Sequence, residues 1–341
     1  MNRLFIDFDP VSKNKWLEQI DSDLKGNTEK LISTVEGITI QPIYHADDNF
    51  KTYNSNFPSN WETYQLIDAT NAKKANKRAL NALQNDVSGL CFAHPNNLDV
   101  LLKDISIEHI RIDFSNYSEN FPLEWENLTI NKNVKGAFHG ITKSNIPNYL
   151  DTIVTQGTAK KQIIDALKKG QKASKKVQFH FKIGSDYFLE IAKLKAFRIL
   201  WKSKTGEDAY LFTSTDTSNK KEESAYNNIL RSTTECMSAI FGGANAIMLN
   251  AYNSSFEKST DFSERIARNQ QTILRKESYL DKVEDPTKGS YYIDYLIQEL
   301  LQDFEIQSEI VEKKLLQNGK ALKGLKYTID TLKRISPILS I

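Results

Sequence analysis

The sequence predicts an α/β fold of the TIM-type (β/α)8 barrel class, in which parallel strands alternate with helices. Short apolar runs such as Val87–Phe92 and Ala244–Asn250 alternate with segments of helical periodicity. The connections between successive strands are long enough to hold the crossover helices that a parallel sheet requires. The length of 341 residues suggests about two domains, yet a barrel of roughly 250 residues can form a single domain.

An N-terminal helical arm is predicted over residues 1–35, ahead of a barrel domain over residues 36–341. Ser12 is placed to cap a helix that ends at Gly26. The apolar face of this helix consists of Trp16, Leu17, Ile20 and Leu24. A single short helix with such a face needs a surface on which to dock. The chain's own barrel and a partner subunit are equally open as that surface.

Six strands can be recognised in the barrel region. They cover Val87–Phe92, His109–Phe114, Val134–Ile141, Lys176–Ile183, Ala209–Thr215 and Ala244–Asn250. The helices cover Lys73–Leu83, Leu98–Lys103, Asn145–Tyr149, Ala159–Lys169, Tyr187–Trp201, Tyr226–Phe241 and Phe262–Glu277. A closed barrel needs two more strands, which we expect near Asp151–Thr155 and Val283–Asp285. The alternatives are an open doubly wound sheet, or a barrel that is shortened or incomplete between Tyr117 and Lys176.

The helix over Tyr226–Phe241 has the strongest local pattern. Its apolar residues recur at helical spacing, and they are Ile229, Leu230, Thr233, Met237, Ile240 and Phe241. Gly242 and Gly243 then predict a left-handed helix end. The next helix begins with Asp261 as a cap and Glu264 three residues later. Its apolar stripe, expected to face the sheet, consists of Phe262, Ile266, Ile273 and Leu274.

Composition and charge narrow the classes of function. The net charge is only +2, from 45 basic and 43 acidic residues, which argues against a nucleic-acid partner. Cys91 and Cys236 lie in apolar runs without the spacing of a metal site, so we expect buried thiols and no metal. No apolar window approaches the roughly 20 residues of a membrane span, and the first residues do not resemble an export signal. We therefore expect no membrane partner and a cytoplasmic location.

A few polar residues at strand ends are candidates for a site. Phosphate-loop, dinucleotide-binding and nucleophile-elbow motifs are absent from the sequence. Asn250 ends one predicted strand, and the stretch Thr213–Thr215 ends another. Sites in α/β barrels are built at the carboxyl ends of the strands, so these residues are expected to line a pocket.

Four charged or titratable side chains are weaker candidates. His94 and His139 also lie at strand ends. Arg265 and Arg268 lie on the polar side of their helix. For these arginines a solvated or salt-bridged helix face is favoured over anion binding.

The run from Tyr226 to Ser290 contains YNNILR, GGANAI, FSERIARNQQ and DPTKGS in this order. Together with KNKWLEQIDSDLKG near the start and IGSDYFLEIAKLKAFRILW at Ile183–Trp201, it resembles the barrel domain of adenosylcobalamin-dependent methylmalonyl-CoA mutases. The resemblance extends along most of the chain and is specific, because many spaced elements recur in order. Lys288 is a departure, since the family's turn is Asp-Pro-x-Gly-Gly-Ser and Lys288 replaces its first glycine.

The resemblance implies that this chain lacks the catalytic residues of the family. Leu66 lies at the position of the family's tyrosine, and Thr152 lies at that of its catalytic histidine. Ser214 takes the place of a substrate-facing glutamine. Asn250 keeps the family's asparagine, but Ser254 replaces a glutamate four positions later. The residues left for a vestigial pocket are Thr213, Ser214 and Asn250.

The resemblance also bears on the cofactor. Catalytic chains of the family carry a C-terminal domain with an Asp-x-His-x-x-Gly motif whose histidine binds cobalt. None of the five histidines here has that context, and about fifty residues follow Ser290. We therefore expect that this chain binds no cofactor and that adenosylcobalamin belongs to a partner large subunit.

These implications predict a non-catalytic small (beta) subunit. The large subunit of the heterodimer would interconvert methylmalonyl-CoA and succinyl-CoA, and this chain would support it. One alternative is the substrate barrel of a split mutase that uses a separately encoded cobalamin-binding chain. Another is a solitary barrel that binds an acyl-CoA.

Overall fold

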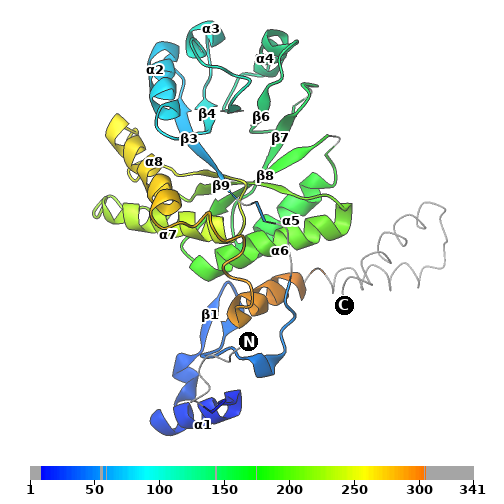
Figure 1. The fold of residues 1–341 in the computed structure, drawn as a ribbon, viewed down its shortest axis with the longest axis vertical. Helices are drawn as coiled ribbons and strands as arrows, with labels where there is room; N and C mark the ends of the chain where they lie inside the picture. The colour runs from blue at the N-terminus through cyan, green and yellow to red at the C-terminus, as the bar shows by residue number, and fades with distance from the viewer. Residues whose placement is uncertain are drawn as a thin grey trace, which may run out of the picture.

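Eight parallel strands close into a barrel in the order β10-β3-β4-β5-β6-β7-β8-β9 in the computed structural model (Figure 1). The structure describes residues 9–304 apart from 54–56, 59, 143, 174 and 303. The strands are β3 (Glu62–Asp68), β4 (Gly89–Ala93), β5 (Arg111–Ser115), β6 (Lys135–Phe138), β7 (Tyr149–Val154), β8 (Val177–Ile183), β9 (Tyr210–Thr215) and β10 (Ala246–Met248). Pairing of Ala246 with Glu62 joins the last strand to the first. The predicted TIM-type barrel is confirmed, and the open sheet is excluded.

Helices surround the barrel and a smaller unit precedes it. Around the barrel lie α2 (Ala72–Leu83), α3 (Leu98–Leu101), α4 (Phe121–Thr129), α5 (Ala159–Gly170), α6 (Tyr187–Thr205), α7 (Asn227–Phe241) and α8 (Asp261–Lys276). Residues 291–302 form a further helix. Before the barrel come α1 (Lys13–Asp23), η1 (Thr28–Leu31), β1 (Ser33–Val35), β2 (Ile38–Ile40) and η2 (Ala46–Asp48). Among the described residues, none of these helices has the length and apolar character needed to cross a membrane.

Two sequence predictions of strand and helix are wrong. Val283–Asp285 is no strand, because the Asp285 carboxylate caps a turn by accepting from the Thr287 amide at 3.2 Å. The strand that completes the set of eight is instead β3, the first barrel strand in the chain. Asn145–Tyr149 is no helix either, because a turn there leads into β7, which starts at Tyr149.

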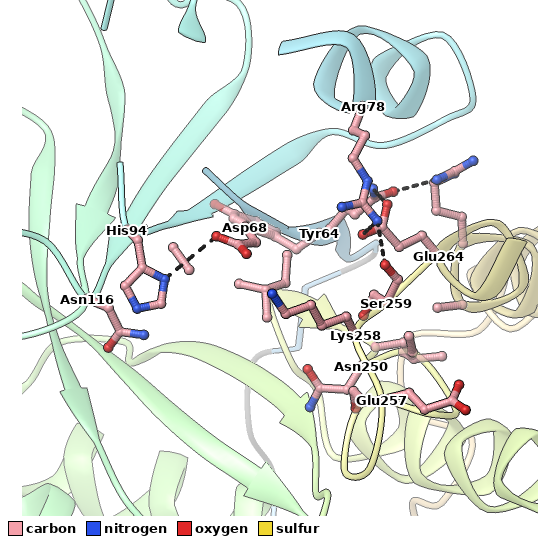
Figure 2. A pocket seen from close by; sticks show the side chains of 18 residues that line it. Tyr64, Asp68, Arg78, His94, Asn116, Asn250, Glu257, Lys258, Ser259 and Glu264 are labelled. Atoms are coloured by element: carbon pink, nitrogen blue, oxygen red, sulfur yellow. Dashed lines mark hydrogen bonds and ion pairs between the residues drawn. The ribbon is translucent and has the colours of Figure 1, made fainter. Parts of the chain in front are cut away.

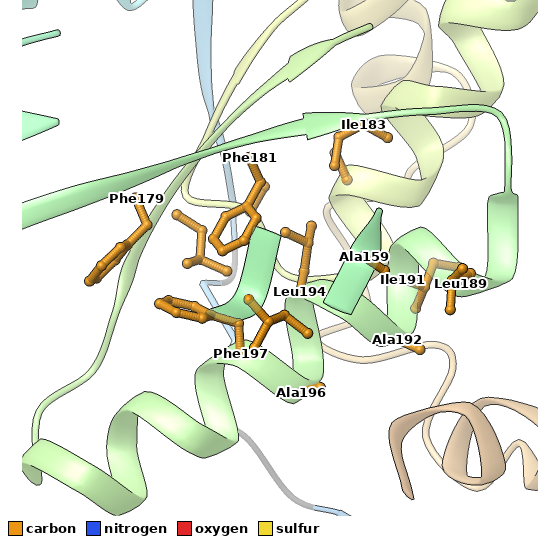
Figure 3. Packing of buried hydrophobic residues seen from close by; sticks show 14 of the residues in the cluster. Ala159, Phe179, Phe181, Ile183, Leu189, Ile191, Ala192, Leu194, Ala196 and Phe197 are labelled. Carbon is orange, nitrogen blue, oxygen red and sulfur yellow. The ribbon is translucent and has the colours of Figure 1, made fainter. Parts of the chain in front are cut away.

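The α6 helix is buried on all sides in its first half, from Leu189 to Arg198. On its inner side, Phe197 packs against Phe179 and Phe181 of β8, with ring centroids 4.7 and 4.9 Å apart (Figure 3). The outer side is covered by the helix over 291–302 and by the β1–β2 hairpin, which Figure 1 shows beside each other. The Tyr295 hydroxyl ties these two elements together by donating to the Thr39 carbonyl at 2.7 Å. Between Leu189 and Arg198 the helix therefore has no solvated face.

Three buried cations on α6 bind to strand β8 and to neighbouring loops. Lys193 donates to the Lys182 carbonyl at 2.7 Å and pairs with Glu190. Lys195 binds Asp285 at 2.9 Å. Arg198 donates to the Ala209 carbonyl at 2.9 Å and to the Asn245 side chain at 2.6 Å. Buried charges need such partners, so these charged residues of an otherwise apolar helix serve to stabilise the fold.

The α1 helix has no buried residue. Its cap is the one predicted, since Ser12 accepts from the Lys15 amide at 3.3 Å. Lys13 anchors it by donating its amide to the Asp47 carboxylate at 2.9 Å and by pairing with Asp48. Figure 1 shows α1 at the far end of the molecule from the barrel, so its apolar face does not reach the core.

The buried face of α8 differs from the predicted stripe. Phe262 and Ile273 are each 46% exposed. The buried residues of the helix are Ser263, Glu264, Ala267, Arg268, Gln270, Gln271 and Leu274. Gln270 shows why polar residues can face inward here, because its amide donates to the Ile229 carbonyl at 2.8 Å. Both cysteines are buried and free, as predicted.

Candidate functional site at the mouth of the barrel

The interior of the barrel is filled by side chains that bond across it. The Tyr64 hydroxyl of β3 donates to Asp113 of β5 at 3.1 Å. Gln178 of β8 donates to Asp113 at 2.8 Å and to Thr152 of β7 at 2.9 Å. Because β3 and β8 are not neighbours of β5 in the sheet, these bonds must run through the barrel axis. Phe212 packs edge-on against the Tyr64 ring at 4.9 Å and helps to close the same space.

Charges inside the barrel are matched. Arg111 pairs with Glu62 at 3.1 Å, and His139 lies 3.2 Å from Asp113. Burial opposes protonation of His139, but Cys91 and Asp113 outweigh it and raise the pKa of His139 to about 10. Arg111, His139 and Asp113 therefore form a charged network inside the barrel, and the partly exposed Glu62 pairs with it at one end.

A pocket of about 420 Å³ lies at the mouth of the barrel, where β3, β4 and β10 end (Figure 2). Asp68 and His94 face each other on one side of it, with 3.8 Å between Oδ1 and Nδ1. On the other side, Arg78 lies between Glu264 and Ser259, and Figure 2 shows both contacts. Arg78 pairs with Glu264 at 2.7 Å and donates to the Ser259 carbonyl at 3.0 Å.

Of the six predicted pocket and family positions, three line this pocket: Leu66, Asn250 and Ser254. The weaker candidates His94 and Arg268 line it as well. Leu66 is 37% exposed and stands directly above the filled interior. The Asn250 side-chain nitrogen donates to the Thr215 carbonyl at 2.6 Å, so this donor is already engaged within the protein. Leu66 offers no polar atom, which leaves Asn250 and Ser254 as the polar groups of the three.

The other three predicted residues lie elsewhere. Thr152 is inside the barrel, bonded to Gln178. Ser214 is also buried, with its hydroxyl 2.8 Å from His180 Nε2. Thr213 is fully buried and donates to the Ala246 carbonyl of the next strand at 3.2 Å. Their side chains are engaged with the protein and do not line the mouth pocket.

Sequence reasoning missed the charged side of the mouth. Arg78 and Glu264 come from α2 and α8, which are neighbours only because the barrel closes. Asp261 was expected to cap α8 in a capping box with Glu264, but Thr260 and Ser263 form that box and Glu264 is buried. Burial raises the pKa of Glu264 to about 7, against the opposing charges of Arg78 and Arg268. Arg268 is hydrogen-bonded to Gln65 at 2.6 Å, so it is not solvated.

The residues at the site do not fit a cobalamin. His139 and His180 are buried inside the barrel and contact Asp113 and Ser214. His94, at the mouth, faces Asp68. Within the described ranges, no group of His, Cys, Asp and Glu side chains is arranged to hold a metal ion.

Comparisons with known proteins identify the family. The profile of the methylmalonyl-CoA mutase family matches residues 155–318. The methylmalonyl-CoA mutase small subunit of Porphyromonas gingivalis is 30% identical over 381 aligned residues, which cover 86% of this chain and 62% of that protein. The methylmalonyl-CoA mutase of Rhizobium meliloti is 40% identical over 136 residues, and a probable large subunit of Mycobacterium bovis is 35% identical over 134.

The chain spans less than two thirds of the length of these relatives. The alignment covers 62% of the small subunit, 19% of the Rhizobium protein and 18% of the Mycobacterium protein. Each of the two latter alignments includes 37% of this chain. The similarity to the small subunit thus extends along most of the chain, whereas similarity to the other two is confined to a shorter part. The chain belongs to the methylmalonyl-CoA mutase family.

Proposed function

We propose that this chain is a non-catalytic small subunit that supports a methylmalonyl-CoA mutase large subunit in a heterodimer. The large subunit would bind adenosylcobalamin and interconvert methylmalonyl-CoA and succinyl-CoA. The observation that carries the proposal is the closed barrel interior. Thr152 and Ser214 occupy positions where the family has catalytic residues, and both are bonded to interior side chains.

The filled interior argues against turnover by this chain. Enzymes need a cavity in which the substrate meets positioned polar groups, and here Tyr64, Asp113 and Gln178 fill that space with mutual hydrogen bonds. Opening it would break a network with Asp113 at its centre, which is fully buried. The mouth pocket that remains is lined by Leu66 at the position of the family's tyrosine.

The arm supports the partner half of the proposal. Trp16, Leu17 and Ile20 form an apolar face, yet none of α1 is buried in the isolated chain. The β1–β2 hairpin that follows is anchored, since Glu36 accepts from the Ala159 amide at 2.7 Å. A helix held away from the core, with its apolar side chains only half-buried, suits docking on a second chain.

Turnover measurements test the proposal. The purified chain, with adenosylcobalamin and methylmalonyl-CoA, is expected to form no succinyl-CoA. Addition of this chain to the large subunit is expected to raise the activity or the melting temperature of the large subunit. Turnover by this chain with a separately supplied cobalamin-binding protein would instead support the split mutase.

The solitary acyl-CoA-binding barrel is the other alternative. It predicts saturable binding of CoA esters to the isolated chain and no association with a large subunit. Calorimetry with methylmalonyl-CoA on the isolated chain separates it from the proposed subunit role.

A further inference from the structure

A second cavity, of about 330 Å³, opens on the outside of the barrel between α2 and α8. Lys77 and Arg78 of α2 line it together with the first two turns of α8. Its wall is continuous with that of the mouth pocket, because Arg78, Glu264 and Arg268 line both cavities. We call this cavity the α2–α8 groove.

The α2–α8 groove carries an excess of positive charge. Four cations, Lys77, Arg78, Arg265 and Arg268, line it with two carboxylates, Asp261 and Glu264. Arg78 forms ion pairs with both carboxylates, at 2.7 Å from Glu264 and 3.4 Å from Asp261. Within the part of the chain that the structure describes, the other three cations have no carboxylate oxygen within 4.0 Å.

Arg268 is the most informative of these cations. It is only 6% exposed, and its two terminal nitrogens donate to neutral amides, Gln65 at 2.6 Å and Asn81 at 3.2 Å. Its Nε is buried and has no partner among the described residues. Its nearest counter-charge, Glu264, is reached only through Gln65, which bonds both side chains, so the buried Nε still lacks a hydrogen-bond partner.

The groove also offers features beyond charge. The N-terminal end of α8 carries the partial positive charge of a helix start, which favours anions. Phe262 is 46% exposed, and the Arg265 guanidinium lies 5.4 Å from its ring centre. An exposed ring with a cation on one face can stack a flat group. Phosphate sites of α/β barrels commonly form at this end of the barrel, beside a helix N-terminus.

We propose that the α2–α8 groove binds a phosphate-bearing anion, with Arg268, Arg265 and Lys77 as its charge partners. Guanidinium groups suit phosphate because their N–H groups match two phosphate oxygens at once. Inorganic pyrophosphate and a nucleoside diphosphate share this chemistry. Phe262 would contact the base of the second ligand only.

Calorimetric titration of the 341-residue chain with inorganic pyrophosphate, at fixed ionic strength, tests the proposal. Lys77→Glu and Arg265→Glu are each expected to weaken binding by about tenfold, because each turns a charge-assisted contact into a repulsion. Lys103→Glu is the matched control. Lys103 is exposed and does not line the groove, so the same change in net charge should leave the affinity unchanged.

A parallel titration with ADP distinguishes the two ligand sources. Tighter binding of ADP, reduced to the pyrophosphate level in Phe262→Ala, would identify a nucleoside phosphate. Equal affinity for both ligands would identify the phosphate group alone. The proposal is overturned if pyrophosphate shows no saturable binding, or if Lys103→Glu weakens binding as much as Lys77→Glu. Because no large subunit is present, this result is independent of the proposed subunit role.

Discussion

Asp113 connects the side chains that close the barrel. Its carboxylate accepts from Tyr64 and Gln178 and faces His139, and the residue is fully buried. The strand pattern HIRIDF already indicates that Arg111 and Asp113 point to the same face of β5, because they alternate with apolar residues. The sequence could not show which residues they meet, since their partners lie on strands that the closure of the barrel brings opposite.

Asp113→Ala is expected to destabilise the protein by about 3–5 kcal/mol, because it leaves the His139 imidazolium buried without its carboxylate. The free energy of unfolding from urea titration measures this. Asp99→Ala removes an exposed carboxylate and should change that free energy by less than about 0.5 kcal/mol. Similar losses in both variants would show that the interior network contributes little.

His139 should make stability depend on pH. Its pKa is about 10 in the folded protein, above the value of about 6.5 for an unfolded chain. A raised pKa stabilises the fold fully below about pH 6.5, and this stabilisation is lost as the pH rises towards 10. The wild-type chain should therefore lose about 1–3 kcal/mol more than His139→Gln between pH 7 and 9. Parallel stability profiles of the two proteins would contradict this assignment.

Elements with strong local patterns were predictable, and those that depend on distant partners were not. The α7 helix and its glycine end lie where predicted, with Gly243 at a φ of 78°. Its predicted apolar stripe is not the buried face, since Leu230 is 68% exposed. The β3 strand was missed because its buried side chains include polar ones such as Gln65, which bonds to Glu264 and Arg268. Its segment lacks the continuous apolar run that marks the other buried strands.

Gly243 has a second role at the end of α7. A Cβ atom there would lie 2.1 Å from the Phe57 ring, in addition to the strain of its positive φ. Gly206, with a φ of 76°, has no atom within 4 Å of such a Cβ. Gly206→Ala should cost about 1–2 kcal/mol from strain alone. Gly243→Ala should cost about 1–3 kcal/mol more from overpacking, as measured by urea titration. Equal costs would mean that Phe57 moves aside freely.

The whole molecule combines a closed barrel with an arm that leaves it. The arm's apolar face was evident from the spacing of Trp16, Leu17 and Ile20. Its two possible docking surfaces could not be separated by sequence, because either would bury the same side chains. In the structure α1 contacts the remainder of the chain through Lys13 and has no buried residue. The apolar side chains of α1 are half-buried, which leaves area for the proposed partner subunit to cover.

Trp16→Glu separates the two docking surfaces. If α1 docks on a partner, this change should alter the free energy of unfolding of the isolated chain by less than about 0.5 kcal/mol. It should weaken association with the large subunit at least about tenfold, because a tryptophan anchor is lost. Lys15→Glu, on the exposed side of α1, is the control and should affect neither quantity. Destabilisation of the isolated chain by Trp16→Glu would place α1 on its own barrel.

The most direct test of the subunit role is the mass of the species formed when this chain is mixed with the methylmalonyl-CoA mutase large subunit of the same organism. Sedimentation velocity at micromolar concentrations measures it. The account predicts one species whose mass is the sum of one copy of each chain. Two species that sediment independently, each with the mass of its isolated protein, would contradict the account.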